Sequence, residues 1–326
     1  MKKITWILMI ATFILVSCKN KDSSRLMTNV TGKAGEVVIV IEPGMWNSNI
    51  GVEFRRKLAQ DYPGLPQAEP LFDLVHIPYS AFSNIFKTHR NILLVKVSNE
   101  YDEPKMIIQK NLYAKPQIVI NILAPDDSSM EALIRDKGDL IVDRLLKKEM
   151  SRYASNYTKY EDKTVGERLE KKFGINITIP KGFKIDMDTT DFVWVANDSP
   201  AMSQGLLIFS YDKPDVELTT PYIIAKRNQF TSQFVKGENP NSFMIVEQEV
   251  EPFRREIVIN KLKVTELRSL WRVEGDFMGG PFVSFTFVDD KKNKVIHADG
   301  FVYAPQFDKR DYIRQLEAIL NSVKLK

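Results

Sequence analysis

The chain of 326 residues contains one cysteine, Cys18, and only three histidines. A single cysteine permits no disulfide within the chain, and the histidines form no HExxH pattern and stand beside no cysteine, which excludes the standard zinc ligand sets. The sequence also lacks a G-x-S-x-G elbow, a G-x-x-x-x-G-K-[ST] phosphate loop and a G-x-G-x-x-G turn after a strand. We therefore assign no catalytic residue and expect no metal and no cofactor.

An excess of charge of one sign is also missing. Lys and Arg total 46 and Asp and Glu total 42, and the two kinds are interspersed without a basic stripe. Nucleic-acid binding needs clustered positive charge to neutralise phosphates, so we expect no nucleic-acid partner. Apolar residues make up 44% of the chain, which is enough for sizeable cores, and this length predicts two domains.

An apolar run opens the chain and ends at the cysteine. Lys2 and Lys3 precede the run at 4–16, an arrangement typical of a secretory signal peptide and too short to span a bilayer, which needs about 20 apolar residues. The tetrapeptide Leu15-Val16-Ser17-Cys18 resembles the lipobox of bacterial lipoproteins. That resemblance implies that residues 1–17 are removed and that Cys18 is acylated. An ordinary signal peptide or an uncleaved anchor is the alternative.

The polar residues 18–34 are predicted to form a flexible tether between the lipid and the folded body. Position 20 is Asn rather than the aspartate that retains some bacterial lipoproteins in the inner membrane, which favours the outer membrane. Asp22 stands alone among lysines, so the acidic cluster that directs surface export in some lineages is absent. We expect a protein that is anchored by lipid to the outer membrane and faces the periplasm, with surface exposure as the alternative.

Residues 35–160 are predicted to form an N-terminal α/β domain. Apolar and β-branched runs predict strands at 36–41, 71–77, 92–97, 106–113 and 117–122. Helices are predicted after Ser48 and after Ser80, the second with Ile85 facing inward. Ser128 and Glu131 form a capping box that opens a long final helix.

Residues 161–326 are predicted to form a second, α+β domain. Strands are expected at 175–179, 192–196, 206–211, 255–259, 262–273, 282–288 and 294–303. Helices are expected from Thr164 to Gly174, from the N-cap Thr220 to Gly237, and after the N-cap Asp308. The chain is therefore predicted to be α+β, with two domains that each contain a mainly antiparallel or mixed sheet covered by helices.

Two groups of residues on the predicted strands are candidates for binding. His297 and Asp299 lie two apart on one strand face, and we interpret this pair as part of a solvated hairpin face because no nucleophile accompanies it. Arg268 and Arg272 share a face with two glutamates and have Trp271 opposite. The arginines are about 13 Å apart by strand rise, so we favour a solvated cross-strand charge ladder over capture of an anionic ligand.

Three tyrosines mark the end of the long helix. Tyr153, Tyr157 and Tyr160 share one helical face, because their spacing is four and then three residues. Such a stripe favours a seam that packs against the neighbouring domain, and binding of a ligand or glycan is the alternative.

Two segments resemble known families. The segment Asn111-Leu-Tyr-Ala-Lys-Pro-Gln117, the strand after it and Ala124-Pro125-Asp126 resemble an uncharacterised lipoprotein family of the Bacteroidota, a domain of unknown function that covers most of the mature chain. The resemblance implies an exported lipoprotein and carries no known activity. Ile177-Thr-Ile-Pro-Lys-Gly-Phe183 resembles the opening strand of the PsbP/Mog1-type sandwich, which implies a fold and no function.

These observations together favour a lipid-anchored envelope protein that acts as a non-enzymatic binding or interaction module. Its partner would be an envelope protein or a glycan, besides the membrane that holds its lipid. The alternative is a hydrolase or transferase that acts on envelope glycans or lipids through carboxylates which the fold brings together.

Overall fold

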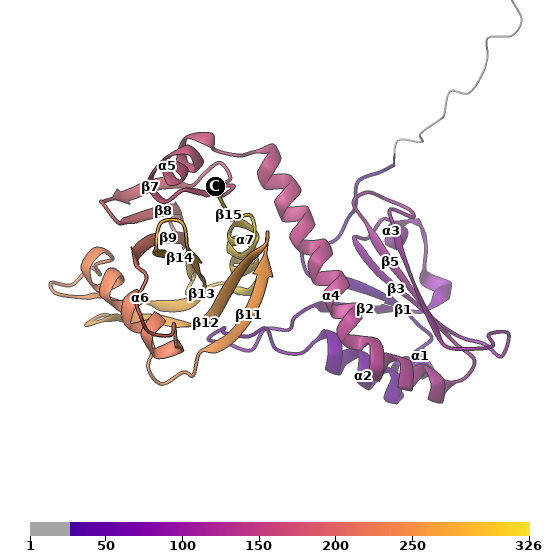
Figure 1. Cartoon of the computed structure of the whole chain (residues 1–326). Coiled ribbons are helices and arrows are strands. Elements are labelled where there is room, and N and C mark those ends of the chain that lie inside the picture. The colour runs from indigo at the N-terminus through magenta and orange to yellow at the C-terminus, as the bar shows by residue number, and fades with distance from the viewer. Residues whose placement is uncertain (1–26) are drawn as a thin grey trace, which may run out of the picture.

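The computed structural model describes residues 27–326, so Cys18, the predicted signal peptide and the start of the predicted tether lie outside the described residues. The protein is α+β and has two domains, which are joined by the long helix α4 (Asp127–Lys159) (Figure 1). The predicted domain boundary at residues 160 and 161 falls between α4 and helix α5 (Lys163–Phe173). Within residues 27–326, no helix combines the length and apolar character needed to cross a membrane.

The N-terminal domain is built on a mixed five-stranded sheet in the order β2-β1-β3-β5-β4. Its strands are β1 (Glu36–Val40), β2 (Asp73–Ile77), β3 (Asn91–Val97), β4 (Lys105–Lys110) and β5 (Ile118–Ala124). Only β4 runs antiparallel to its neighbour. The β-branched residues of β1 and β3 are buried on both faces, as a parallel sheet requires.

Helices cover both faces of this sheet. They are α1 (Pro43–Trp46), α2 (Asn49–Leu58), the 3-10 turn η1 (Tyr79–Ala81), α3 (Asn84–Lys87) and α4. Ser48 caps α2 as predicted, since its hydroxyl accepts the backbone N–H of Ile50. The inward position predicted for Ile85 is wrong, because this side chain is 78% exposed. The capping box predicted for α4 is also wrong: Asp126 caps the helix and accepts the backbone N–H of Ser129 at 2.8 Å.

The C-terminal domain contains a curled antiparallel sheet of eight strands. The main path is β10-β12-β13-β14-β9-β8-β7, and β11 also pairs with β12. The strands are β7 (Lys184–Asp188), β8 (Phe192–Ser199), β9 (Met202–Asp212), β10 (Phe243–Val246), β11 (Phe253–Ile259), β12 (Leu262–Glu274), β13 (Gly279–Asp289) and β14 (Lys294–Tyr303). A separate pair joins β6 (Ile175–Asn176) to β15 (Lys324–Leu325). The strands predicted at 255–259, 262–273, 282–288 and 294–303 are confirmed, whereas β7, β10 and β15 were not predicted.

Helices also cover both faces of the second sheet. Helices α5 and α7 (Arg310–Leu320) pack on one face and α6 (Thr220–Phe234) packs on the other. The predicted C-cap of α5 is confirmed, because Gly174 is left-handed with φ of +74°. Helix α6 begins one residue earlier than predicted, with Thr219 as its N-cap.

The cap predicted for α7 is wrong for a reason that lies in the other domain. Lys309, not Asp308, occupies the N-cap and makes no side-chain capping bond. Instead the buried Glu69 of the N-terminal domain accepts the backbone N–H groups of Lys309 and Arg310 at 2.7 and 2.8 Å. A carboxylate there satisfies two free N–H groups and complements the helix dipole. The N-terminal domain therefore caps α7 and fixes it against the domain boundary.

Candidate functional site

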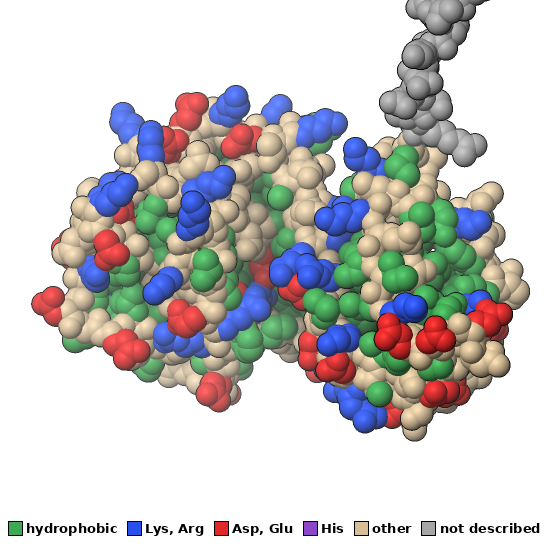
Figure 2. All heavy atoms as spheres, turned by 45° about the vertical axis from the view of Figure 1, so that its right-hand side comes forward, with side chains coloured by type: hydrophobic (Ala, Val, Ile, Leu, Met, Phe, Trp, Pro, Cys, Tyr) green, Lys and Arg blue, Asp and Glu red, His purple; other side chains and the backbone are tan. Residues whose placement is uncertain are grey.

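A cavity of about 430 Å³ lies where α4 meets α7 at the boundary between the domains. Five of its lining residues come from one face of α4, one precedes β3 and one lies on α7. They are Arg90, Glu149, Arg152, Tyr153, Asn156, Tyr157 and Gln315. The volume lies within the range of ligand pockets, about 300–1,000 Å³. Figure 2 shows the two domains as separate lobes with a valley between them.

Glu149 is held at the base of this cavity by three neighbours. Its Oε1 accepts hydrogen bonds from Arg152 Nη1 at 2.6 Å and from Asn91 Nδ2 at 2.7 Å, and Arg90 Nε lies 3.7 Å from it. Burial lowers the pKa of Arg152 to about 10, so this guanidinium remains charged at neutral pH. Glu149 is 1% exposed, which leaves its carboxylate dependent on these partners.

Two buried polar atoms in this cluster have no hydrogen-bond partner among the described residues. They are Oε2 of Glu149, an acceptor, and Nε of Arg90, a donor. A buried donor or acceptor without a partner costs about 1–3 kcal/mol, and few remain unpaired in native proteins. Both atoms are shielded from solvent beside the cavity, and a group that both donates and accepts would satisfy them.

Two of the three tyrosines predicted as a stripe face this cavity. The ring centroids of Tyr153 and Tyr157 are 6.0 Å apart, and neither hydroxyl bonds to another described residue. Burial raises the pKa of Tyr153 to about 12 and also raises the pKa of Tyr157, so both hydroxyls stay neutral. Tyr160 is 46% exposed and does not line the cavity.

Arg268 and its neighbour Glu266 are buried, so the predicted solvated ladder is wrong for these two residues. Arg268 binds Glu266 at 2.5 Å, donates to the Tyr62 hydroxyl at 2.8 Å and pairs with Glu317 of α7. Burial alone would lower the pKa of Arg268, but Tyr62 and Glu266 favour the charged form and the net shift is upward. Alternation along β12 placed both side chains on one face, but it could not show that α7 and the N-terminal domain cover this face.

The other end of β12 matches the predicted ladder more closely. Arg272 is partly exposed and lies 2.6 Å from Glu274 and 3.6 Å from Glu247. Trp271 is buried on the opposite face, where its Nε1 donates to the carbonyl of Val302 at 3.3 Å. Trp271 is therefore part of the core rather than of a binding surface.

His297 and Asp299 are fully buried, so the predicted solvated hairpin face is wrong. Helix α6 covers them, and Arg227 Nε donates to Asp299 Oδ2 at 2.6 Å. His297 Nδ1 lies 2.8 Å from Thr286 Oγ1, while its Nε2 is 3.7 Å from Asp299 Oδ2, beyond hydrogen-bond length.

Burial and the neighbouring arginine set the protonation of this pair. Burial lowers the pKa of His297. Burial would raise the pKa of Asp299, but the charge of Arg227, the neighbouring His297 and the hydrogen bond from Arg227 together more than offset this, and the pKa is lowered. The pair is thus a neutral imidazole beside a paired carboxylate, held in the core without access to a substrate.

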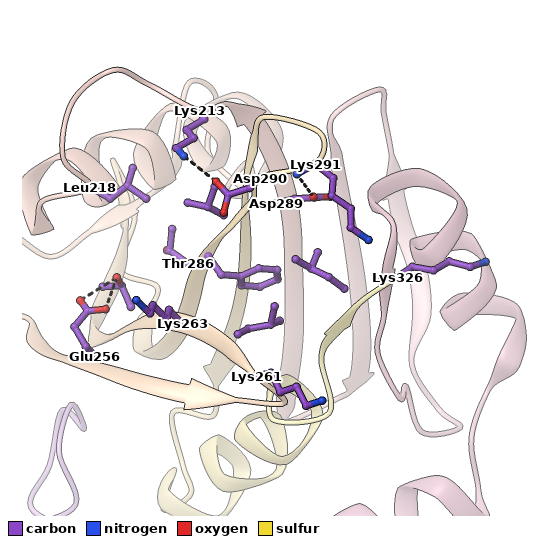
Figure 3. A pocket seen from close by; sticks show the side chains of 15 residues that line it. Lys213, Leu218, Glu256, Lys261, Lys263, Thr286, Asp289, Asp290, Lys291 and Lys326 are labelled. Atoms are coloured by element: carbon purple, nitrogen blue, oxygen red, sulfur yellow. Dashed lines mark hydrogen bonds and ion pairs between the residues drawn. The ribbon is translucent and has the colours of Figure 1, made fainter.

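Two other hollows on the surface are weaker candidates for a functional site. A cavity of about 760 Å³ in the C-terminal domain has an apolar floor and a rim of lysines and acids (Figure 3). Lys213 pairs with Asp290 at 2.8 Å, and Asp289 accepts the backbone N–H of Lys291. A groove of about 440 Å³ lies between α4, β11 and α7. Across residues 27–326, no three His, Cys, Asp or Glu residues gather as a metal site would require.

Solved structures share part of this architecture. The cyanobacterial PsbP of Synechocystis sp. PCC 6803 is 13% identical and aligns with 47% of this chain and 87% of its own, with a TM-score of 0.30. The Saccharomyces cerevisiae Ran-binding protein Mog1p is 7% identical and aligns with 47% of this chain and 90% of its own, with a TM-score of 0.32. Likenesses at this level carry no argument about function. No curated protein matches the chain.

Family models divide the sequence much as the structure does. Residues 30–158 match a domain of unknown function (DUF8532), and residues 162–322 match a second domain of unknown function (DUF4837). The resemblance had implied one such domain over most of the mature chain, whereas two successive domains are found. The two domains of the structure thus match two successive family models of unknown function, DUF8532 and then DUF4837.

Proposed function

We propose that this protein is a lipid-anchored binding module of the bacterial outer membrane, and that it holds a saccharide in the cavity between α4 and α7. The observation that carries the proposal is the unpartnered acceptor of Glu149 beside the unpartnered donor of Arg90. A sugar hydroxyl both donates and accepts, so neighbouring hydroxyls on one ring can satisfy both atoms. The free hydroxyls of Tyr153 and Tyr157 add further groups of the same kind.

The charge of the cavity favours an acidic sugar over a neutral one. Arg90 and Arg152 contribute two positive charges and Glu149 one negative charge, while both tyrosines are neutral. The net positive charge lies in a partly buried site, where screening by salt is weak. A carboxylate or phosphate on the sugar would therefore strengthen binding.

The lining of the cavity favours binding rather than hydrolysis. Glycoside hydrolysis needs two carboxylates that flank the scissile bond. Glu149 is the only carboxylate among the described residues that line the cavity, and Arg152 and Asn91 hold one of its oxygens. The hydrolase or transferase alternative therefore gains no support from this site.

Calorimetric titration of the mature protein with glucose and with glucuronic acid tests the proposed site. We expect glucuronic acid to bind more tightly than glucose. Tyr153→Phe should weaken binding about 2- to 10-fold, since one hydrogen bond contributes about 0.5–1.5 kcal/mol. Tyr160→Phe, at the C-cap of the same helix, is the matched control and should leave the Kd unchanged. Absence of heat with both sugars, or an equal effect of the two substitutions, would refute the site.

The proposed anchor is tested separately from the site. Mass spectrometry of the native protein should find Cys18 acylated at the N-terminus, and Cys18→Ser should release the protein from the membrane fraction. A bare thiol or a retained leader would refute the anchor. Protease treatment of intact cells should leave the protein uncut if it faces the periplasm.

A further inference from the structure

One end of the N-terminal domain receives the chain that comes from the proposed anchor. The backbone N–H of Lys115 donates to the carbonyl of Thr28 at 2.9 Å, which holds the incoming segment against the turn between β4 and β5. Cys18 lies ten residues before Thr28, and ten residues span at most about 36 Å. A lipid on Cys18 therefore keeps this end of the domain close to a membrane. We call it the entry end, made of residues 28–31, 84–90 and 110–117.

The entry end carries a cluster of lysines. Lys110 and Lys115 lie at the ends of the β4–β5 turn, and Lys87 lies on α3. Lys148 of α4 is close to this turn, because burial and nearby positive charges, including those of Lys110 and Lys115, lower its pKa. The ion pairs of lysines among the described residues involve none of these four. Their charges are therefore available to an anionic partner.

Apolar side chains are exposed among these lysines. Leu112 in the turn is 39% exposed and Ile85 on α3 is 78% exposed. Between them the rings of Phe82 and Tyr113 are 6.1 Å apart, and Lys87 Nζ lies 6.0 Å from each ring centroid. Exposed apolar side chains that gather in this way mark sites of interaction with proteins or membranes. Together with free lysines, they are typical of surfaces that bind anionic membranes.

The opposite end of the same sheet carries acids instead. The loop at 98–104 between β3 and β4 contains Glu100, Asp102 and Glu103 and no basic residue, and all three acids are exposed. Figure 2 shows hydrophobic side chains on the upper part of the N-terminal lobe and acids on its lower part. An anionic surface attracts the entry end and repels this loop, so it orients the domain.

We propose that the entry end docks on a phospholipid surface that contains anionic headgroups. The lysines pair with lipid phosphates, and Leu112 and Ile85 enter the boundary between headgroups and acyl chains. The inference rests on the proposed lipid anchor, since the anchor is what brings this end to a membrane. An acidic protein would also pair with the lysines, but the short segment from Cys18 leaves the membrane as the nearest anionic surface.

Binding to vesicles tests the docking without the lipid. The protein is the mature chain with Cys18→Ser, and the probes are vesicles of phosphatidylcholine alone or with about one third phosphatidylglycerol, in about 50 mM NaCl to limit screening. We expect cosedimentation with the anionic vesicles only. The triple variant Lys110→Gln, Lys115→Gln and Lys148→Gln should bind about 100-fold more weakly, because each lysine near an anionic surface contributes about 5-fold. This variant removes charges that repel one another, so we expect it to fold.

Two controls locate the contact. A matched triple variant removes the same charge from exposed lysines of the C-terminal domain and should bind within about 3-fold of the unsubstituted chain; it is Lys236→Gln, Lys263→Gln and Lys291→Gln. A polarity-sensitive fluorophore on Leu112→Cys should emit at shorter wavelength when anionic vesicles are added. The same fluorophore on Val52→Cys should not respond, because Val52 is 50% exposed but lies on α2.

Three outcomes would overturn the inference. They are absence of cosedimentation with anionic vesicles, equal weakening of binding by the two triple variants, and an unshifted fluorophore at position 112. The anchor is measured separately, by mass spectrometry of Cys18 in the native protein. Failure of the docking surface can therefore be told from failure of the anchor, and neither result depends on whether the cavity beside Tyr153 binds a sugar.

Discussion

The pair of Arg227 and Asp299 beneath α6 makes a sharp test of how this fold is held together. Both side chains are fully buried, and Arg227 bonds to the two carboxylate oxygens at 2.6 and 3.4 Å. Asp299→Asn keeps the shape of the side chain but leaves the Arg227 charge without its partner, 4.0 Å from the ring of Phe282. Breaking a buried pair in this way costs about 3–5 kcal/mol.

Hydrogen exchange of backbone amides measures this loss of stability in the strands around Asp299. Amides of β13 and β14 should exchange roughly 100- to 5,000-fold faster in Asp299→Asn, since about 1.4 kcal/mol corresponds to a factor of ten. The double variant Arg227→Met with Asp299→Leu should recover most of the protection, because it removes both charges. Asp290→Asn is the control, since its pair with Lys213 is exposed and contributes little. Less than 10-fold acceleration, or a double variant no better than the single one, would refute the reasoning.

Three further predictions follow from buried groups. Burial lowers the pKa of His297, so the unfolded state takes up a proton below about 6.5 while the folded state stays neutral. The free energy of unfolding should therefore fall as the pH decreases below 6.5, by up to about 1.4 kcal/mol per pH unit. Urea denaturation at several pH values measures this dependence, and the same dependence on pH in His297→Gln would contradict the prediction. Tyr62→Phe should cost about 1–3 kcal/mol, because Arg268 and Glu317 lose a partner at the domain boundary, and an unchanged denaturation midpoint would show otherwise. Gly300→Ala should lower the melting temperature by several degrees, because its Cβ would lie 2.9 Å from that of Leu316, and an unaltered melting curve would count against this packing.

Local sequence signals predicted most of the strands but not what covers them. Alternation along β12 and β14 correctly placed Glu266 with Arg268, and His297 with Asp299, on shared faces. Both pairs are buried because helices and a second domain from distant parts of the chain pack over them. Arg227 could have been found, since it lies four residues after Ile223 on the apolar stripe of α6.

The candidate cavity was only partly visible in the sequence. Helical spacing identified Tyr153 and Tyr157, and it left open whether they pack against a domain or hold a ligand. Arg90 gave no signal, because it lies 59 residues before Glu149 and meets it only when β3 packs beside α4. The N-cap predicted for α7 was wrong for the same reason, because the acidic residue that binds the start of this helix, Glu69, comes from the other domain.

The central claim is that the cavity between the domains binds a hydroxyl-rich ligand, and NMR of the tyrosine rings tests it most directly. With ring-labelled tyrosine in the mature protein, saturation with glucuronic acid should shift the resonances of Tyr153 and Tyr157 and leave that of Tyr160 in place. No shift at saturating sugar, or a shift of Tyr160 as large as those of the other two, would contradict the account.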